Sequence, residues 1–138
     1  MKSNIYKIIA SFILITFFSG CNQDQPKFEL TGKLNGIKEG KIFLSEYNDA
    51  GIQKTDTLLI NNGEFKFVGN IPEPVRYALK IEGKEYGTYF YAENSGITIT
   101  GDADSMYKAL IIGGRINEED KKYRTGLEKM AKSMRDKF

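Results

Sequence analysis

The sequence predicts an all-β protein: a small antiparallel β-sandwich of about eight short strands, followed by one C-terminal amphipathic α-helix. Two observations lead to this prediction. Between residues 27 and 114, short runs of alternating apolar and polar residues are separated by turn signals, a pattern typical of antiparallel sheets. After residue 114 the apolar residues recur at helical spacing instead.

Each predicted strand is a short run with one apolar face. The strands are residues 28–31, 41–46, 57–61, 64–68, 75–81, 86–92, 97–100 and 109–112. Asn62-Gly63 is the strongest hairpin signal, because both residues tolerate the positive φ of a type I′ turn. Pro72 and Pro74 cannot donate ladder hydrogen bonds, so residues 70–74 should cross between sheets or enter an edge. A second layer must cover the apolar faces, and an open barrel is the alternative to the sandwich.

The last segment, residues 115–138, has the pattern of an amphipathic helix. Asn117 is expected as its N-cap, and the acidic residues 118–120 should lie near the positive end of the helix dipole. Its apolar stripe consists of Tyr123, Leu127, Met130 and Met134. This stripe could pack on the β domain, dock on another domain or lie on a membrane. Packing on its own domain is the expected use, because most amphipathic helices are stabilised that way.

Residues 1–20 have the features of a secretory signal peptide. Lys2 and Lys7 supply a positive start, and Ile8 to Phe18 form an apolar run of eleven residues. A helix needs roughly 17 to 25 apolar residues to span a bilayer, so this run predicts a signal peptide and not a membrane span.

The residues that end this segment, Phe18, Ser19, Gly20 and Cys21, resemble a bacterial lipobox. In lipoprotein precursors the cysteine receives a diacylglycerol, and a peptidase cleaves the chain immediately before it. Phe18 stands where leucine is more usual. We therefore expect cleavage before Cys21, lipidation of Cys21, and residues 21–26 as a short tether that holds a domain of residues 27–114 close to the bilayer.

Composition excludes several chemistries. The chain of 138 residues has no histidine and a single cysteine, which removes imidazole catalysis, C-x-x-C redox pairs and thiolate zinc sites. Without residues 1–20, basic and acidic side chains are equal in number, so no basic stripe favours nucleic acid. We expect no catalytic residue, no metal site and no cofactor.

Aromatic residues are densest in the strand that begins at Tyr86. Tyr89 and Tyr91 should share one face of this strand, opposite Phe90. Burial is the expected state of these rings, because aromatic side chains favour strands and dominate cores. If Tyr86, Tyr89 and Tyr91 are exposed instead, they form a possible ligand surface for a protein or a glycan.

The order of several segments resembles the family called domain of unknown function 4369. The segments that carry the resemblance are residues 28–36, 41–44, 56–69, 72–79, 93–102 and 111–119. In that family the domain typically stands at the N-terminus of exported lipoproteins, ahead of a thioredoxin-like or peroxiredoxin-like domain. The resemblance implies that the helix after Asn117 leads towards such a domain. Because the chain has no C-x-x-C motif, thiol-disulfide activity is not carried over.

These observations predict a membrane-anchored bacterial lipoprotein whose β domain is a non-catalytic accessory or interaction domain. We expect it in the cell envelope, at the outer membrane, facing the periplasm or the cell surface. Its partners would be the membrane, through the lipid, and a protein or thioredoxin-like domain. The alternatives are a truncated thiol-disulfide oxidoreductase without its catalytic domain, and a glycan- or peptide-binding module.

Overall fold

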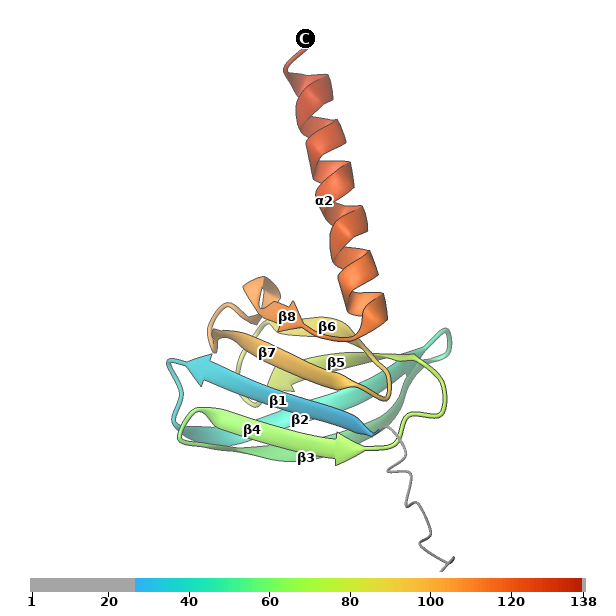
Figure 1. Ribbon diagram of the computed structural model, residues 1–138. Coiled ribbons are helices and arrows are strands. Elements are labelled where there is room, and N and C mark those ends of the chain that lie inside the picture. Colours follow the sequence, from blue (N-terminus) through green and yellow to red (C-terminus); the bar gives the residue numbers. More distant parts are fainter. Residues whose placement is uncertain (1–26, 138) are drawn as a thin grey trace, which may run out of the picture.

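A computed structural model describes residues 27–137 (Figure 1). The predicted signal peptide, Cys21 and the tether lie outside the described residues. The elements follow in this order: β1 (Phe28–Asn35), β2 (Glu39–Asn48), β3 (Gly51–Asn61), β4 (Glu64–Gly69), β5 (Val75–Ile81), β6 (Gly87–Ala92), β7 (Gly96–Asp102), the 3₁₀ helix η2 (Met106–Lys108), β8 (Leu110–Ile112) and α2 (Arg115–Arg135). Eight strands followed by one long helix confirm the predicted all-β domain with its C-terminal helix.

The strands form one curled sheet and not the two separate sheets of a sandwich. Its order is β6-β5-β2-β3-β4-β1-β7-β8. Strands β7, β1 and β4 lie in front of β5, β2 and β3, and the chain of hydrogen-bonded neighbours continues from one group to the other through β3 and β4 (Figure 1). The predicted sandwich is therefore replaced by a nearly closed sheet, closer to the open barrel that was its alternative.

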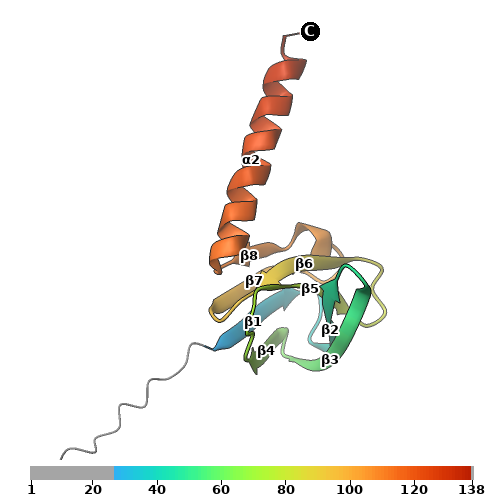
Figure 2. The same cartoon turned by 90° about the vertical axis from the view of Figure 1, so that its right-hand side faces the viewer.

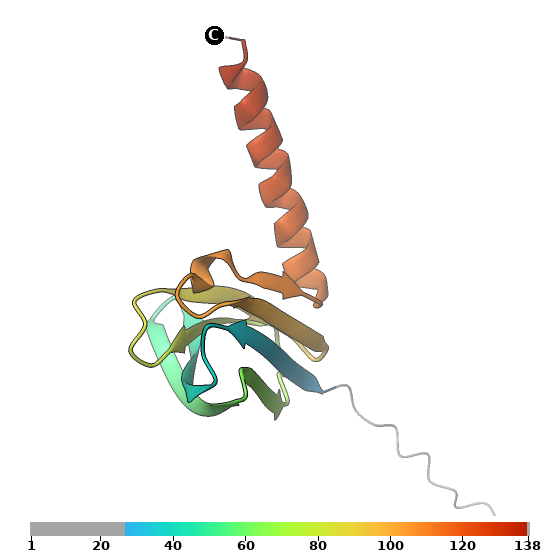
Figure 3. The ribbon, with the colours of Figure 1, turned by 90° about the vertical axis from the view of Figure 1, so that its left-hand side faces the viewer.

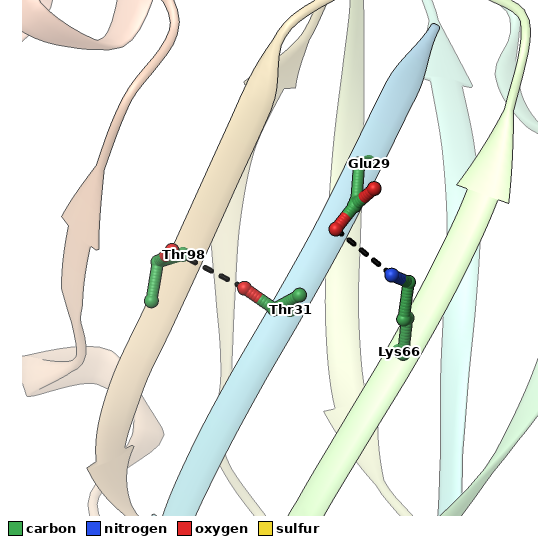
Figure 4. Close-up of polar contacts among 4 residues, drawn as sticks. All are labelled: Glu29, Thr31, Lys66 and Thr98. Atoms are coloured by element: carbon green, nitrogen blue, oxygen red, sulfur yellow. Dashed lines mark hydrogen bonds and ion pairs between the residues drawn. The ribbon is translucent and has the colours of Figure 1, made fainter.

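One strand pair departs from the predicted antiparallel arrangement. β1 runs parallel to β7, whereas the other neighbouring strands are antiparallel. Thr31 of β1 meets Thr98 of β7 with their hydroxyl oxygens 3.2 Å apart, and Lys66 of β4 donates to Glu29 over 2.9 Å (Figure 4). A parallel pair needs a long connection, and the five strands between β1 and β7 in the chain supply it.

The hairpin between β3 and β4 turns at the predicted residues. Asn62 and Gly63 have φ values of 52° and 78°, as a type I′ turn requires. The turn places Phe65 in the core and Phe67 at its margin, on the same face of β4. The same alternation buries Ile97 and Ile99 in β7.

The core fills the space inside the curled sheet. Phe28, Tyr77 and Phe90 stack there, with ring centroids 5.9 to 6.4 Å apart. Residues 70–74, with their two prolines, carry the chain from β4 to β5 past β3 and β2. Ile71 in this connection is buried and its N–H donates to Asn94 Oδ1 over 2.8 Å, so the crossing is attached to the core.

Helix α2 projects away from the β domain, as two perpendicular views show (Figures 1 and 2). It begins at Arg115 with Gly114 as N-cap, so the prediction that Asn117 caps it is wrong. Its apolar stripe is exposed, which contradicts the expected packing on its own domain. Within residues 27–137, no helix is apolar and long enough to cross a membrane.

Candidate functional site

The outer face of β6 carries exposed tyrosines. Alternation along this edge strand turns Thr88 and Phe90 inward and Tyr89 and Tyr91 outward. Tyr89 is 51% exposed and Tyr86, just before the strand, is 50% exposed. The expected burial is therefore wrong for these two rings: Thr88 and Phe90 take the inward positions of β6, and Tyr86 precedes the strand. Tyr86 and Tyr89 are exposed and Tyr91 is partly covered. These three residues therefore fit the alternative prediction, a ligand surface.

Tyr89 is held between two neighbours. The Arg76 guanidinium lies 4.4 Å from the centroid of the Tyr89 ring, within the range of a cation–π contact. On another side the ring meets Tyr47 edge-on, at a centroid distance of 6.0 Å. These contacts restrict the rotamer of Tyr89, so little conformational entropy would be lost if a partner bound it.

A second tyrosine pair adjoins β6. The Tyr86 and Tyr107 rings meet edge to face with centroids 5.3 Å apart, and Tyr107 is 58% exposed. Sequence reasoning missed Tyr107, because it stands in the short helix η2, outside the strand pattern. We call Arg76, Tyr86, Tyr89, Tyr91 and Tyr107 the tyrosine surface.

A hollow of about 610 Å³ opens beside the tyrosine surface. Its lining comes from β6, from the segment between η2 and β8, and from residues 117–128 of α2. The ribbon in Figure 3 shows η2, β8 and the start of α2 on the same side of the β domain. Tyr89, Tyr91 and Tyr107 line one side, and charged residues of α2 line the other. Those charged residues are Asp120, Lys121, Arg124 and Glu128. Arg124 Nε donates to Asp120 Oδ2 over 2.7 Å, so the wall carries both signs of charge.

The start of α2 is attached to the free edge of β6. Asn117 accepts a hydrogen bond from Tyr91 N–H and donates one to Tyr91 C=O, each 2.8 Å long. The same amide nitrogen donates to the Gly113 C=O over 3.1 Å. The Asn117 side chain thus makes the two hydrogen bonds to Tyr91 that a neighbouring strand would otherwise make. These bonds also orient α2, whose residues line one side of the hollow.

Two glycines allow the turn into α2. Gly113 and Gly114 have φ values of 94° and 80°, in the region that favours glycine. A Cβ on Gly113 would overlap the Gly96 carbonyl oxygen of β7. The chain can therefore turn from β8 into the helix only with a very small residue at this point.

Among residues 27–137 no group of three carboxylate or thiol side chains could hold a metal ion. Asp102 accepts a hydrogen bond from the Asp104 N–H over 2.9 Å, in a surface turn. Burial raises the pKa of Tyr77, in the core and away from the tyrosine surface. The tyrosine surface presents aromatic rings, hydroxyl groups and the Arg76 guanidinium. These groups are suited to binding another molecule by stacking and hydrogen bonding.

The comparisons with known proteins define the class. The family described as Domain of unknown function (DUF4369) matches residues 28–120, which comprise the whole curled sheet and the first turns of α2. The chain belongs to this family, as the order of its segments predicts. No curated protein and no solved structure matches the chain significantly.

Proposed function

We propose that the chain is a membrane-anchored bacterial lipoprotein of the cell envelope whose β domain is a non-catalytic interaction domain. The domain would bind a protein partner through the tyrosine surface. The exposed, mutually packed Tyr89 and Arg76 support this most directly. Tyrosine and arginine are over-represented among residues that dominate binding energy at protein interfaces.

The position of the domain supports anchoring close to the bilayer. Residues 22–27 alone separate Cys21 from the first strand, so the strand begins within about 25 Å of the lipidated residue. A partner held on the tyrosine surface would therefore be kept near the membrane.

Anchoring is tested by labelling cells that produce the full chain with a fatty acid analogue. The wild-type protein should incorporate the label and sediment with membranes. The Cys21→Ala variant should do neither, and Ser19→Ala, which keeps a small residue in the predicted lipobox, should be labelled normally. Equal labelling of wild type and Cys21→Ala would refute lipidation at this residue.

Partner binding is tested by placing a photo-crosslinking amino acid at Tyr89 of the anchored chain. Val68 is the matched control position, because it is 50% exposed and lies on β4, away from β6 (Figure 1). Irradiated cells should give a discrete adduct from position 89, absent from position 68 and weakened by Arg76→Ala. Adducts of equal yield at both positions would contradict a specific protein-binding surface.

The hollow beside Tyr91 supports a second candidate, a glycan- or peptide-binding module. Its volume of about 610 Å³ falls in the range of small-ligand sites, and its tyrosine wall can stack on a sugar ring or a peptide side chain. Arrays of oligosaccharides and peptides should then identify ligands that bind wild type but not Tyr89→Ala/Tyr91→Ala. Binding that persists undiminished in this variant would exclude the candidate.

A further inference from the structure

The exposed stripe of α2 has the spacing of a coiled-coil seam. Its members are Tyr123, Leu127, Met130 and Met134, each between 46% and 67% exposed. They follow one another at intervals of four, three and four residues, the alternation of seam positions in a heptad repeat. An apolar stripe left exposed on a helix that projects from its own domain marks a contact surface.

Two charged residues continue this seam at its ends. Asp120 stands three residues before Tyr123, and Lys137 stands three residues after Met134. Asp120 lies within α2, where it is also ion-paired with Arg124 over 2.7 Å, and Lys137 lies in the turn two residues beyond the end of α2, where its N–H donates to the Met134 C=O over 3.3 Å. In sequence the two positions follow the heptad spacing, with opposite charges at opposite ends. The first turns of α2 carry Glu118, Glu119 and Asp120 beside Arg115, Lys121 and Lys122, whereas the last turns carry Lys129, Lys132, Arg135 and Lys137 beside Glu128 and Asp136.

We propose that α2 pairs in antiparallel orientation with α2 of a second copy of this chain. In one register every seam residue meets a suitable counterpart. Leu127 lies opposite Met130 of the second copy, Tyr123 opposite its Met134, and Asp120 opposite its Lys137. Two-fold symmetry repeats each contact. The pair therefore has four apolar layers with an ion pair at each end.

The parallel arrangement is less favourable for a definite electrostatic reason. It would place Asp120 opposite Asp120 and Lys137 opposite Lys137, and like charges at a seam are repulsive. An antiparallel register moved by one heptad would instead place Asp120 against Met130 of the second copy. Only the proposed register pairs both charged seam residues with opposite charges.

The neighbouring positions and the β domain leave room for the second helix. Gly126 and Ser133 flank the seam on one side and Ala131 on the other, so small residues permit close approach. Of the α2 residues that line the hollow, Asp120 belongs to the seam itself, and Lys121, Arg124 and Glu128 each stand one residue after a seam position. These three lie about 100° around the helix from the seam, on the same side as Ala131. The pairing uses no residue of the tyrosine surface and does not rest on the proposed function.

Disulfide trapping tests the orientation in cells that produce the full, anchored chain. One tagged copy carries Tyr123→Cys and a second, differently tagged copy carries Met134→Cys. The two copies together should form a mixed disulfide dimer, and each copy alone should not, because these positions lie about 16 Å apart along the helix. The chain without added cysteines gives the background from Cys21.

Charge reversal tests the register. In the trapping pair, Asp120→Lys in both copies should lower the yield of mixed dimer about tenfold, as expected for two ion pairs turned into repulsion. Adding Lys137→Asp should restore it. Absence of the mixed dimer, self-trapping of either single variant at the same yield, or failure of the second reversal to restore trapping would each overturn the proposal. A stripe covered by a membrane or another domain would give the first of these results.

Discussion

Asn117 and Tyr91 are joined by a pair of hydrogen bonds that connect the helix to the sheet. The side-chain amide of Asn117 accepts from the Tyr91 N–H and donates to the Tyr91 C=O, both at 2.8 Å. In an antiparallel strand the N–H and C=O of one residue point to the same side. Asn117 therefore satisfies the edge of β6 that faces away from β5, where the sheet does not close.

Replacing Asn117 should weaken the attachment of α2 to β6 and make the edge of β6 less stable. Asn117→Ala leaves two partly covered backbone groups of Tyr91 unpaired, which costs about 1–3 kcal/mol. Amide hydrogen exchange at Tyr91 should accelerate about tenfold to a hundredfold, and urea unfolding should shift to lower concentration. Lys122→Ala, an exposed change on the same helix, is the control. Unchanged exchange at Tyr91 would show that this contact does not hold the helix.

Adding a methyl group at Gly113 should also destabilise the domain, because the methyl group would collide with the backbone of β7. The Cβ would overlap the Gly96 carbonyl oxygen, and φ is 94°. We expect Gly113→Ala to lower the free energy of unfolding by about 1–3 kcal/mol, measured by chemical denaturation. Gly51→Ala has a similar φ of 101° and open space around the added atom, so it measures the conformational cost alone. Equal losses at both positions would argue against the overlap.

Much of the sheet is predictable because its strands follow local rules. Alternation predicts that Ile97, Ile99 and Phe65 point inward, and the positive φ of Asn62 and Gly63 follows from their residue types. The parallel pairing of β1 with β7 is not predictable in this way, since it depends on contacts between segments distant in sequence. The sequence pattern therefore predicts eight strands but not their single curled sheet.

The candidate site, too, is only partly predictable from the sequence. Strand periodicity places Tyr89 and Tyr91 on one face, but it does not tell whether that face is covered. Tyr107 adjoins Tyr86 only because η2 returns beside the start of β6, and no local pattern signals this. Asn117 has the residue type of an N-cap, whereas the N-cap of α2 is Gly114, with its φ of 80°. The Asn117 side chain is thus free to bind β6.

A close contact across β1 and β4 predicts a strong effect of a small substitution. Gly32 lies opposite Phe65 in the strand register, and a Cβ on Gly32 would overlap the Phe65 ring. Gly32→Ala should therefore destabilise the domain by about 1–3 kcal/mol, whereas Gly96→Ala, which has open space, should have little effect. The double variant Gly32→Ala/Phe65→Leu should lose less stability than the two single losses together. Simple additivity would contradict the contact.

Ionisation of Tyr77 should limit stability at alkaline pH. Burial raises the pKa of Tyr77 above its ordinary value of 10.0, and the carboxylates of Glu46 and Asp56 raise it further. Above pH 10 the unfolded chain releases this proton before the folded chain does. The free energy of unfolding should therefore fall as pH rises through this window, by up to about 1.4 kcal/mol per pH unit for this one proton.

Tyr77→Phe isolates this effect, because it keeps the ring that stacks on Phe90 with centroids 5.9 Å apart. The variant should lose less stability than wild type between about pH 9.5 and pH 11, that is, from about half a unit below to about one unit above the ordinary tyrosine pKa. Chemical denaturation at fixed pH values measures the difference. Tyr123→Phe is the control, since Tyr123 is 67% exposed on α2 and removal of its hydroxyl should leave the pH dependence unchanged. If both variants follow the wild-type curve, Tyr77 ionises equally in the folded and unfolded chain, and its hydroxyl is accessible to water in the folded domain.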